Sequence, residues 1–276
     1  MRSWASICGA LLFAVAGLGL LARHPALAQP TTGVSPGDRM TGDVAPVHDP
    51  AIIKQGGSYY LFSTTIARSG TGQIPIRTST DLIHWTLTGA VFAQMPDWAK
   101  REIPKANGIW APDISFANGE YRLYYAVSTF GSNRSAIGLA TSPTLDASAP
   151  NYRWTDKGEV LASTVANDFN AIDPAAITDR DGRAWLVFGS FWTGIKMVRL
   201  DSATGLRAAD DQKVYSLARR PAPDAIEAPF LIEHGGYYYL FASFDFCCRG
   251  VDSTYYTVVG RSRQSSDHIS TMTASR

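Results

Sequence analysis

The sequence predicts an all-β protein of the β-propeller class, and three observations lead to this prediction. Aromatic and β-branched residues gather in short runs, Gly-Gly or Asp-Gly pairs separate several of these runs, and a four-strand pattern recurs roughly every 55–65 residues. Such runs form strands rather than helices, and the glycine pairs are typical of hairpin turns. A four-stranded unit that repeats at this interval is what a propeller blade requires.

Four segments supply the first two strands of each unit. Each segment opens with an acidic residue beside a proline and passes through a short apolar strand. It then turns and returns through an aromatic-rich strand that ends close to a serine. The segments cover residues 49–64, 112–128, 173–190 and 227–243.

Further strands are expected after these hairpins. The third strands are predicted near Ile74, Ser135, Ile195 and Tyr256. Two units add a fourth strand that contains tryptophan and leads to a glycine turn, "HWTLTG" from His84 and "RWTDKG" from Arg153. About four blades are therefore expected, within a propeller domain over residues 29–263.

The propeller fold explains why an acidic residue recurs at the start of each unit. The first strand of each propeller blade lines the central channel, so equivalent positions at the starts of these strands meet at one end of the axis. A proline is tolerated there because the first residues of an inner strand have little pairing to lose. The sequence thus predicts that four acids converge on one pocket: Asp49, Asp113, Asp173 and Glu227.

Converging carboxylates suit one kind of chemistry in particular. They repel one another and raise one another's pKa, which costs stability unless the groups are used. A neutral acid and an ionised base at the right distance open a glycosidic bond, and aromatic side chains stack on sugar rings. Two alternatives stay open. The acids beside proline could only shape turns, or they could hold calcium, although a calcium cage would need more oxygen ligands per loop.

The N-terminus reads as a secretory signal peptide over residues 1–28. Arg2 precedes a long apolar run, and Ala26-Leu27-Ala28 offers the small-residue pattern that signal peptidase needs. We expect cleavage before Gln29, which would make the protein secreted or periplasmic. The alternative is an uncleaved anchor, because the apolar run is nearly long enough to cross a bilayer.

Charge and cysteine content exclude several partner classes. Arg2 and Arg23 leave with the signal, so Lys+Arg falls from 25 to 23 against 24 acidic residues. A nearly neutral chain argues against nucleic acid as a partner, and no membrane contact is expected after cleavage. No Cys/His spacing suggests zinc. Cys247 and Cys248 are adjacent, and we expect two small buried thiols because a disulfide between neighbours is sterically awkward.

Several motifs resemble those of the arabinanases of glycoside hydrolase family 43. These enzymes are five-bladed propellers that cut α-1,5-linked L-arabinan with inversion of configuration. The resemblance runs from about Asp43 to Arg263. It is carried by "VHDPAII" from Val47, "GIWAPDI" from Gly108, "YYAVSTFGSNRSAIGLATS" from Tyr124, "FNAIDPA" from Phe169, "FGSFWTGI" from Phe188, "IEAPFLI" from Ile226 and "FDFCCRG" from Phe244.

The resemblance implies roles for three of the acids. It makes Asp49 the general base that activates water and Glu227 the general acid that protonates the leaving oxygen. Asp173 becomes the third carboxylate, which raises the pKa of the acid and orients it. An inverting pair needs about 6.5–9.5 Å between base and acid, and a third anion would keep Glu227 protonated near neutral pH.

The resemblance also implies substrate contacts. Trp110 is similar to the aromatic floor for an arabinose unit, with a core tryptophan as the alternative. Asp113 is expected to be structural, and His48 to be a packed neighbour rather than a catalyst. Weaker candidates for substrate binding, each with an alternative role in packing or turns, are Phe130, Asn170, Ser190 and Arg249.

The C-terminal residues depart from the family pattern. The family continues with a whole fifth blade, which carries a histidine that supports a metal, usually calcium. Here the chain reads "QSSDHISTMTASR" from Gln264, a polar tail expected to be disordered and to match nothing. His268 lies in no matching motif, so no metal ligand is assigned. We therefore expect an incompletely closed propeller of reduced stability and uncertain activity.

The sequence favours a monomeric endo-acting arabinan hydrolase that needs no cofactor for its chemistry. An exo-arabinofuranosidase or β-xylosidase would keep the fold and the acids. An inactive sugar-binding propeller is the alternative from another class. Fructan-processing propellers rank low, because they would present Arg-Asp-Pro where this chain has Ile172-Asp173-Pro174.

Overall fold

The computed structural model describes residues 36–66, 72–269 and 272–274. The predicted signal peptide, residues 1–28, lies outside the described residues. From Arg39 onward the chain forms one folding unit, and its strands are arranged in four sheets. No helix within the described ranges is long and apolar enough to cross a bilayer.

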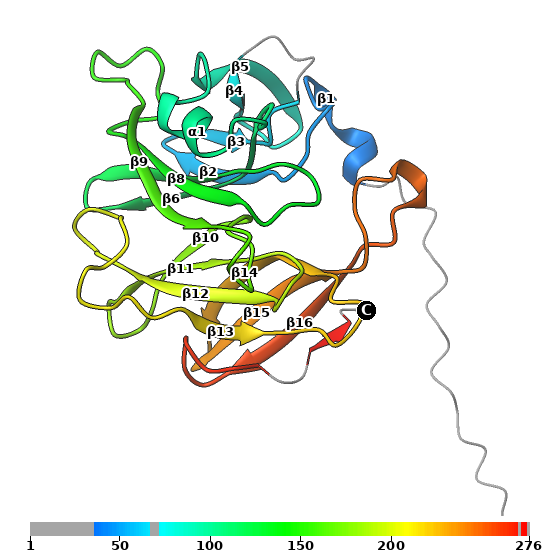
Figure 1. Ribbon diagram of the computed structural model, residues 1–276. Helices are drawn as coiled ribbons and strands as arrows, with labels where there is room; N and C mark the ends of the chain where they lie inside the picture. The colour runs from blue at the N-terminus through cyan, green and yellow to red at the C-terminus, as the bar shows by residue number, and fades with distance from the viewer. Residues whose placement is uncertain (1–35, 67–71, 270–271, 275–276) are drawn as a thin grey trace, which may run out of the picture. The chain divides into compact units, whose positions relative to one another are not determined.

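The four sheets follow one another in chain order as four propeller blades (Figure 1). This confirms the predicted all-β propeller. Blade 1 contains β2 (Ala51–Gln55), β3 (Ser58–Phe62), β4 (Gln73–Ser79) and β5 (His84–Phe92), and β1 (Thr41–Gly42) pairs with β5 in parallel. Blade 2 contains β6 (Ile109–Ala117), β7 (Glu120–Val127), β8 (Ser135–Ser142) and β9 (Thr155–Ser163).

Blades 3 and 4 repeat the same antiparallel order. Blade 3 contains β10 (Ala175–Thr178), β11 (Ala184–Phe188), β12 (Ile195–Leu200) and β13 (Tyr215–Ala218). Blade 4 contains β14 (Ile226–His234), β15 (Tyr237–Phe244), β16 (Tyr256–Ser262) and β17 (Thr273–Ala274). Short helical segments are η1 (Pro36–Arg39), α1 (Asp97–Glu102) and η2 (Gly250–Asp252).

The first strand of each blade lies beside the first strand of the next. β2 contacts β6, β6 contacts β10, and β10 contacts β14. Each of these strands forms an antiparallel hairpin with the strand that follows it, as the aromatic runs and glycine turns predict. Residues at the starts of β2, β6, β10 and β14 are therefore brought to one end of the inner strands.

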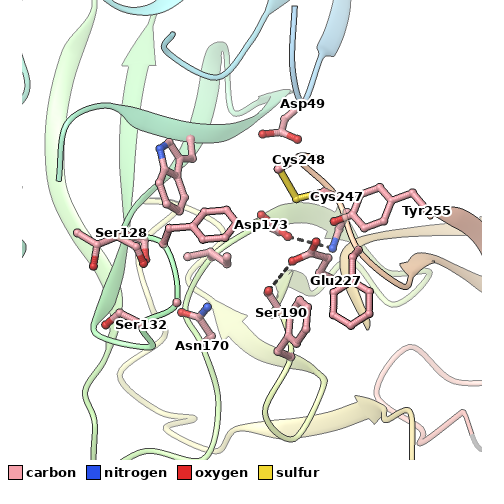
Figure 2. A pocket seen from close by; sticks show the side chains of 18 of the residues that line it. Asp49, Ser128, Ser132, Asn170, Asp173, Ser190, Glu227, Cys247, Cys248 and Tyr255 are labelled. Atoms are coloured by element: carbon pink, nitrogen blue, oxygen red, sulfur yellow. Dashed lines mark hydrogen bonds between the residues drawn. A yellow bond between two sulfur atoms is a disulfide. The ribbon is translucent and has the colours of Figure 1, made fainter. Parts of the chain in front are cut away.

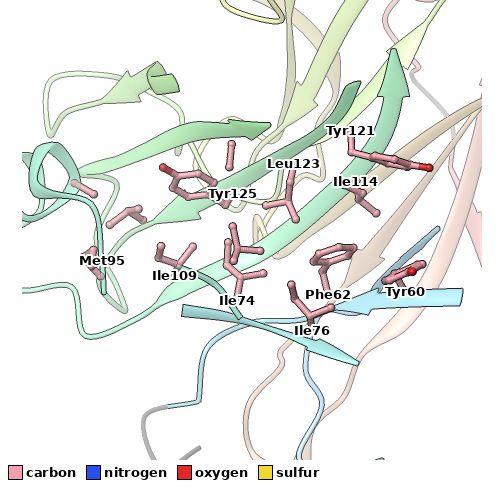
Figure 3. Close-up of a cluster of buried hydrophobic side chains, with 14 of the residues drawn as sticks. Tyr60, Phe62, Ile74, Ile76, Met95, Ile109, Ile114, Tyr121, Leu123 and Tyr125 are labelled. Carbon is pink, nitrogen blue, oxygen red and sulfur yellow. The ribbon is translucent and has the colours of Figure 1, made fainter. Parts of the chain in front are cut away.

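Three hydrophobic clusters join successive blades. Figure 3 shows the cluster between blades 1 and 2, in which Phe62 and Ile74 face Ile109 and Leu123. A second cluster packs Leu139 of blade 2 against blade 3, and a third joins blades 3 and 4. Each cluster buries large side chains completely, so hydrophobic packing holds each blade on its neighbour.

Blades 4 and 1 are not joined in this way by the residues that the structure describes. The three clusters contain no packing of β14 against β2. Instead Ile52 of β2, with Phe230 and Ile232 of β14, remains exposed. At the pocket end of the inner strands, Cys248 Sγ of the β15–β16 connection lies 3.9 Å from His48 Nε2.

The C-terminal residues differ from the expected disordered tail. Ile269 is buried in the cluster between blades 3 and 4, and its backbone N–H donates to Leu217 O at 2.6 Å. Ser265 donates to Asp179 Oδ2, and Thr273–Ala274 pairs with β16. A polar sequence without strand periodicity hides this packing because one apolar residue and a few hydrogen bonds supply it.

Candidate active site

One pocket of about 820 Å³ opens at the starts of the inner strands. Its walls come from all four blades (Figure 2). Every residue to which the sequence analysis gives a catalytic or substrate-binding role lines this pocket. They are Asp49, Trp110, Phe130, Asn170, Asp173, Ser190, Glu227 and Arg249.

Four prolines mark corresponding positions at the starts of the inner strands. Each is preceded by a residue whose backbone φ lies between 42° and 55°, the left-handed region that residues other than glycine rarely adopt. In β6 and β14 the ladder register shifts at this point, which is a β-bulge. Such bulges redirect side chains and concentrate beside active sites. The residues before the prolines are Asp49, Ala111, Asp173 and Ala228.

The prolines, not the acids, are therefore in register. The acid stands directly before proline in blades 1 and 3, two positions before it in blade 4, and directly after it in blade 2. The prediction of four equivalent, converging acids is wrong in this respect. Asp49, Asp173 and Glu227 line the pocket, whereas Asp113 does not.

Asp113 connects two blades instead. Its Oδ2 accepts a hydrogen bond from the backbone N–H of Ala176 at the start of β10, at 2.8 Å. Burial raises the pKa of Asp113 to about 6, although the hydrogen bond from Ala176 opposes the shift. This position agrees with the structural role expected for Asp113.

Asp49 is held by a short chain of hydrogen bonds. Thr64 Oγ1 donates to Asp49 Oδ2 at 2.5 Å, and the backbone N–H of Ala111 donates to Thr64 Oγ1 at 2.8 Å. On its other side, Asp49 Oδ1 lies 3.3 Å from His48 Nε2. Asp49 is therefore fixed to the inner strand of blade 2 through Thr64, while its carboxylate stays partly exposed to the pocket.

Glu227 and Asp173 lie on neighbouring blades and are also held in place. Ser190 Oγ donates to Glu227 Oε2 at 2.6 Å, and the backbone N–H of Ala228 donates to Asp173 Oδ2 at 3.0 Å. Figure 2 shows both hydrogen bonds, with Asp49 facing the same hollow from the side of blade 1. Only 8% of the Glu227 surface is exposed, so this acid is the most enclosed of the three.

Burial and mutual repulsion raise the pKa of two of these acids. The pKa of Asp173 is well above its ordinary value, first because of burial and then because of the charges of Glu227 and Asp49. Burial also raises the pKa of Glu227, with Asp49 adding to the shift and the Ser190 hydrogen bond opposing it. Both shifts favour the protonated form, so these two carboxyls keep their protons to higher pH than isolated carboxyls would.

A second group of hydroxyl and amide side chains shapes the wall formed by blades 2 and 3. Ser135 Oγ donates to Asn170 Oδ1 at 2.6 Å and lies 2.7 Å from Ser128 Oγ. With Oδ1 occupied in this way, the amide nitrogen of Asn170 is the group that can donate to a ligand. Phe130 stands on the loop between β7 and β8 with 81% of its surface exposed, and both Phe130 and Trp110 line the pocket.

Blade 4 contributes the connection between β15 and β16. Phe246, Cys247, Cys248, Arg249 and Tyr255 of this connection line the pocket. Cys247 and Cys248 form a disulfide and are partly or fully exposed, so the prediction of two buried thiols is wrong. An open connection between strands can adopt the turned backbone that this bond requires, whereas a regular strand could not. Cys248 has a φ of 65°.

Some lining residues were not nominated from the sequence. Thr64 and Ser128 follow the returning strands of blades 1 and 2 and line the pocket, at places that correspond to that of the nominated Ser190 in blade 3. The small hydroxyl residue that closes each repeat was the signal that could have found them together. Phe191 and Trp192 lie within a motif that carries the family resemblance, but their backbone φ values of 55° and 45° could not be foreseen.

The residues described do not fit the calcium ion that the family resemblance implies. Within residues 36–66, 72–269 and 272–274, no three His, Cys, Asp or Glu side chains form a group that could hold a metal ion. His268 Nδ1 instead lies 3.3 Å from the backbone oxygen of Ser216 on β13.

The fold and the pocket define a β-propeller that gathers three carboxylates, two of them with raised pKa, in an aromatic-walled site. The chain belongs to glycosyl hydrolases family 43, whose family model matches residues 45–273. This match includes most of the C-terminal residues that were expected to match nothing.

Two curated relatives show the same relationship. The chain is 46% identical over 231 residues to an extracellular exo-α-(1→5)-L-arabinofuranosidase of Cellvibrio japonicus, covering 79% of this chain and 64% of the relative. It is 44% identical over 219 residues to an extracellular endo-α-(1→5)-L-arabinanase of Bacillus subtilis, covering 79% of this chain and 65% of that protein. The chain thus spans slightly less than two thirds of the length of these relatives.

Solved structures agree with the sequence matches. An endo-arabinanase of Bacillus licheniformis superimposes with a TM-score of 0.75 at 45% identity, covering 82% of this chain and 75% of that one. The Cellvibrio cellulosa α-L-arabinanase complexed with arabinohexaose gives a TM-score of 0.73 at 42% identity, covering 80% and 72%. The arrangement of four blades described above is therefore shared with known members of the family.

Proposed function

We propose that this protein hydrolyses the α-1,5-linked L-arabinofuranosidic bonds of arabinan with inversion of configuration. The observation that carries the proposal is the meeting of Asp49, Asp173 and Glu227 in one pocket, with the pKa of two of these carboxyls raised. Opening a glycosidic bond requires one protonated and one ionised carboxyl group, and the raised pKa values of Asp173 and Glu227 favour the protonated member of such a pair.

In the proposed mechanism Glu227 is the general acid and Asp49 is the general base. The enclosed Glu227 protonates the leaving oxygen, while Asp49 removes a proton from the water that attacks the opposite face of the sugar. Asp173 keeps the shared proton on the pair and holds Glu227 in its protonated form near neutral pH. Inversion requires about 6.5–9.5 Å between the acid and the base so that water fits between them.

Sugar binding is assigned to the walls of the pocket. Trp110 and Phe130 offer aromatic surfaces for the C–H faces of arabinose rings. The amide of Asn170 and the guanidinium of Arg249 supply hydrogen-bond donors. Ser190 acts on the acid, since its hydroxyl donates to Glu227.

We propose endo action, with exo action as the second candidate. An endo-arabinanase and an exo-arabinofuranosidase are both similar to this chain at more than 40% identity, so similarity alone does not separate the two modes. We also propose a secreted or periplasmic location. Both relatives are named as extracellular, and the predicted signal peptide over residues 1–28 would direct export.

Incubation with linear and branched arabinan tests the proposal, with product lengths read by chromatography and anomeric form by NMR. Endo action predicts a mixture of oligosaccharides early in the reaction, and exo action predicts a single short product. Inversion predicts that the first sugar released has the β configuration. A protein that binds arabinan without shortening it would instead be a sugar-binding propeller, and the proposal would be wrong.

A further inference from the structure

The disulfide between Cys247 and Cys248 lies in the wall of the pocket rather than in the core of the protein. It belongs to the connection between β15 and β16 and reaches toward blade 1. There Cys248 Sγ lies 3.9 Å from His48 Nε2, which is itself 3.3 Å from Asp49 Oδ1. Figure 2 shows the sulfur–sulfur bond on the side of the pocket where Asp49 stands, next to Tyr255.

The bond contributes little to the stability of the fold. A disulfide stabilises a protein mainly by closing a long loop in the unfolded chain, and the effect grows with the length of that loop. Cys247 and Cys248 are adjacent, so their bond joins no distant elements. Its effect is confined to the local shape and chemistry of the connection that carries it.

Other contacts already hold the base of this connection. The backbone N–H of Thr254 donates to Phe246 O at 3.0 Å, and Arg220 Nη1 lies 2.6 Å from Asp245 Oδ1. The Phe246 ring packs against Phe191 of blade 3, with ring centroids 6.0 Å apart. The disulfide instead fixes the exposed part of the connection, where Cys248 has a left-handed backbone with a φ of 65°.

We propose that the Cys247–Cys248 disulfide is a sugar-contacting surface of the pocket. The inference rests on the proposed function and deepens it. Two bonded sulfur atoms form a polarisable, apolar surface without a hydrogen-bond donor, and such a surface suits the C–H face of an arabinose ring. The bond also holds this surface in one orientation beside Asp49. The disulfide therefore sets substrate affinity on the side of the pocket formed by blades 4 and 1.

Reduction provides a direct way to remove this surface. Tris(2-carboxyethyl)phosphine breaks the sulfur–sulfur bond and leaves two thiols, with two electrons from the phosphine and two protons from water, while the phosphine becomes its oxide. The two thiols rotate independently, each carries a weak donor, and Cys248 is released from its restraint. The ordered apolar surface is then lost, although the three carboxylates keep their positions.

The test compares KM and kcat for linear arabinan in the oxidised protein, the phosphine-treated protein, and the double variant Cys247→Ala/Cys248→Ala. We expect KM to rise about tenfold on treatment and in the variant, the size of effect that one lost apolar contact produces. We expect kcat to fall less than threefold. The phosphine should leave the double variant unchanged, which controls for effects elsewhere in the protein. Thermal unfolding should show midpoints within a few degrees of one another.

Unchanged KM in the treated protein would overturn the inference while leaving the proposed function intact. Where the double variant does not fold, the treated natural protein alone decides the question. Oxidised protein that hydrolyses no arabinan would overturn the proposed function, and the inference would fall with it. A parallel fall in kcat with constant KM would also overturn the inference, because it would place the disulfide in the chemistry rather than in binding.

Discussion

Asp113 on blade 2 and the three carboxylates of the pocket all stand within two positions of a proline, yet they have different neighbours. Asp49, Asp173 and Glu227 face a shared hollow, and burial together with neighbouring negative charge raises the pKa of Asp173 and of Glu227. Asp113 turns away from the hollow and accepts a hydrogen bond from Ala176 on the next blade. The same residue type thus lines a shared pocket in one place and connects two blades in another.

The difference comes from one or two positions along the backbone. The residues directly before and directly after a proline are two positions apart and would share a face in a regular strand, but in blade 2 the positive φ of Ala111 and the bulge in β6 interrupt that alternation, so Asp113 does not line the hollow. Asp49 and Asp173 precede their prolines, and the bulge in β14 lets Glu227 reach the same hollow from one position further back. Position relative to the proline therefore decides which acids can take part in chemistry.

The largest effect is expected from the acids that face the pocket. In the proposed mechanism, Glu227→Gln removes the proton that the leaving oxygen needs, and Asp49→Asn removes the base that activates water. Each change should lower kcat for arabinan about 10²–10⁴-fold, the contribution typical of general acid–base catalysis. Initial rates on linear arabinan measure the loss.

Binding separates these variants from an unfolded protein. Both should bind arabino-oligosaccharides with affinity close to that of the natural protein, as measured by isothermal titration calorimetry. Full hydrolysis by Glu227→Gln would contradict its assignment as the acid. It would also remove the contrast between Asp113 and the pocket acids.

Asp173→Asn should have a smaller effect and a distinctive pH dependence. Removing this charge ends the repulsion that raises the pKa of the pair, so Glu227 should lose its proton at lower pH. We expect kcat to fall about 10–100-fold at neutral pH. The alkaline limb of the pH–rate profile should also move toward lower pH. A profile with an unmoved alkaline limb would show that Asp173 does not act through the proton on Glu227.

Much of this arrangement could be predicted from the sequence because it depends on repetition. Four hairpins with glycine turns indicated the blades, and acids beside prolines at corresponding places indicated a shared pocket. The register could not be predicted in the same way. The alignment of Asp113 with the other acids depended on chemical type, whereas the backbone is aligned by the prolines and by the positive φ of the residues before them.

The C-terminal residues and the cysteines show a second limit of sequence reasoning. Ile269 is a single apolar residue in a polar stretch, and only the neighbouring surface of blades 3 and 4 explains its burial. A disulfide between Cys247 and Cys248 is disfavoured in regular backbone, and it forms where an irregular connection allows it. Long-range packing and local backbone shape decide these cases, and neither leaves a periodic pattern in the sequence.

Two exposed phenylalanines of blade 2 extend the comparison to substrate binding. Phe130 is 81% exposed and lines the pocket, whereas Phe116 is 57% exposed, packs on Tyr121 and lies outside the pocket lining. Phe130→Ala should raise KM for arabinan about three- to tenfold, because a stacking surface for the sugar is lost. Phe116→Ala is the matched control and should leave KM unchanged. Equal effects of the two substitutions would mean that Phe130 has no specific contact with the sugar.

The smallest effect on activity is expected for Asp113→Asn, which tests the connecting side of the comparison. An asparagine oxygen can still accept the N–H of Ala176, so arabinan hydrolysis should change less than twofold. Stability should respond to pH instead. The folded-state pKa of Asp113 is about 6, above its ordinary 3.8, so between about pH 4 and 6 the folded protein retains a proton that the unfolded chain has lost.

The free energy of unfolding of the natural protein should therefore fall as pH rises through this window, and the deficit should persist above pH 6. Below about pH 4 both states are protonated and Asp113 has no such effect. Asp113→Asn removes the deficit, which is on the order of 1–2 kcal/mol for a partly exposed carboxyl. The variant should match or exceed the natural protein in stability at pH 7. Denaturant unfolding at pH 4 and pH 7 measures the difference.

An equally steep pH dependence in the variant would show that the charge of Asp113 does not oppose folding. A loss of hydrolysis as large as that of Glu227→Gln would place Asp113 among the reactive acids.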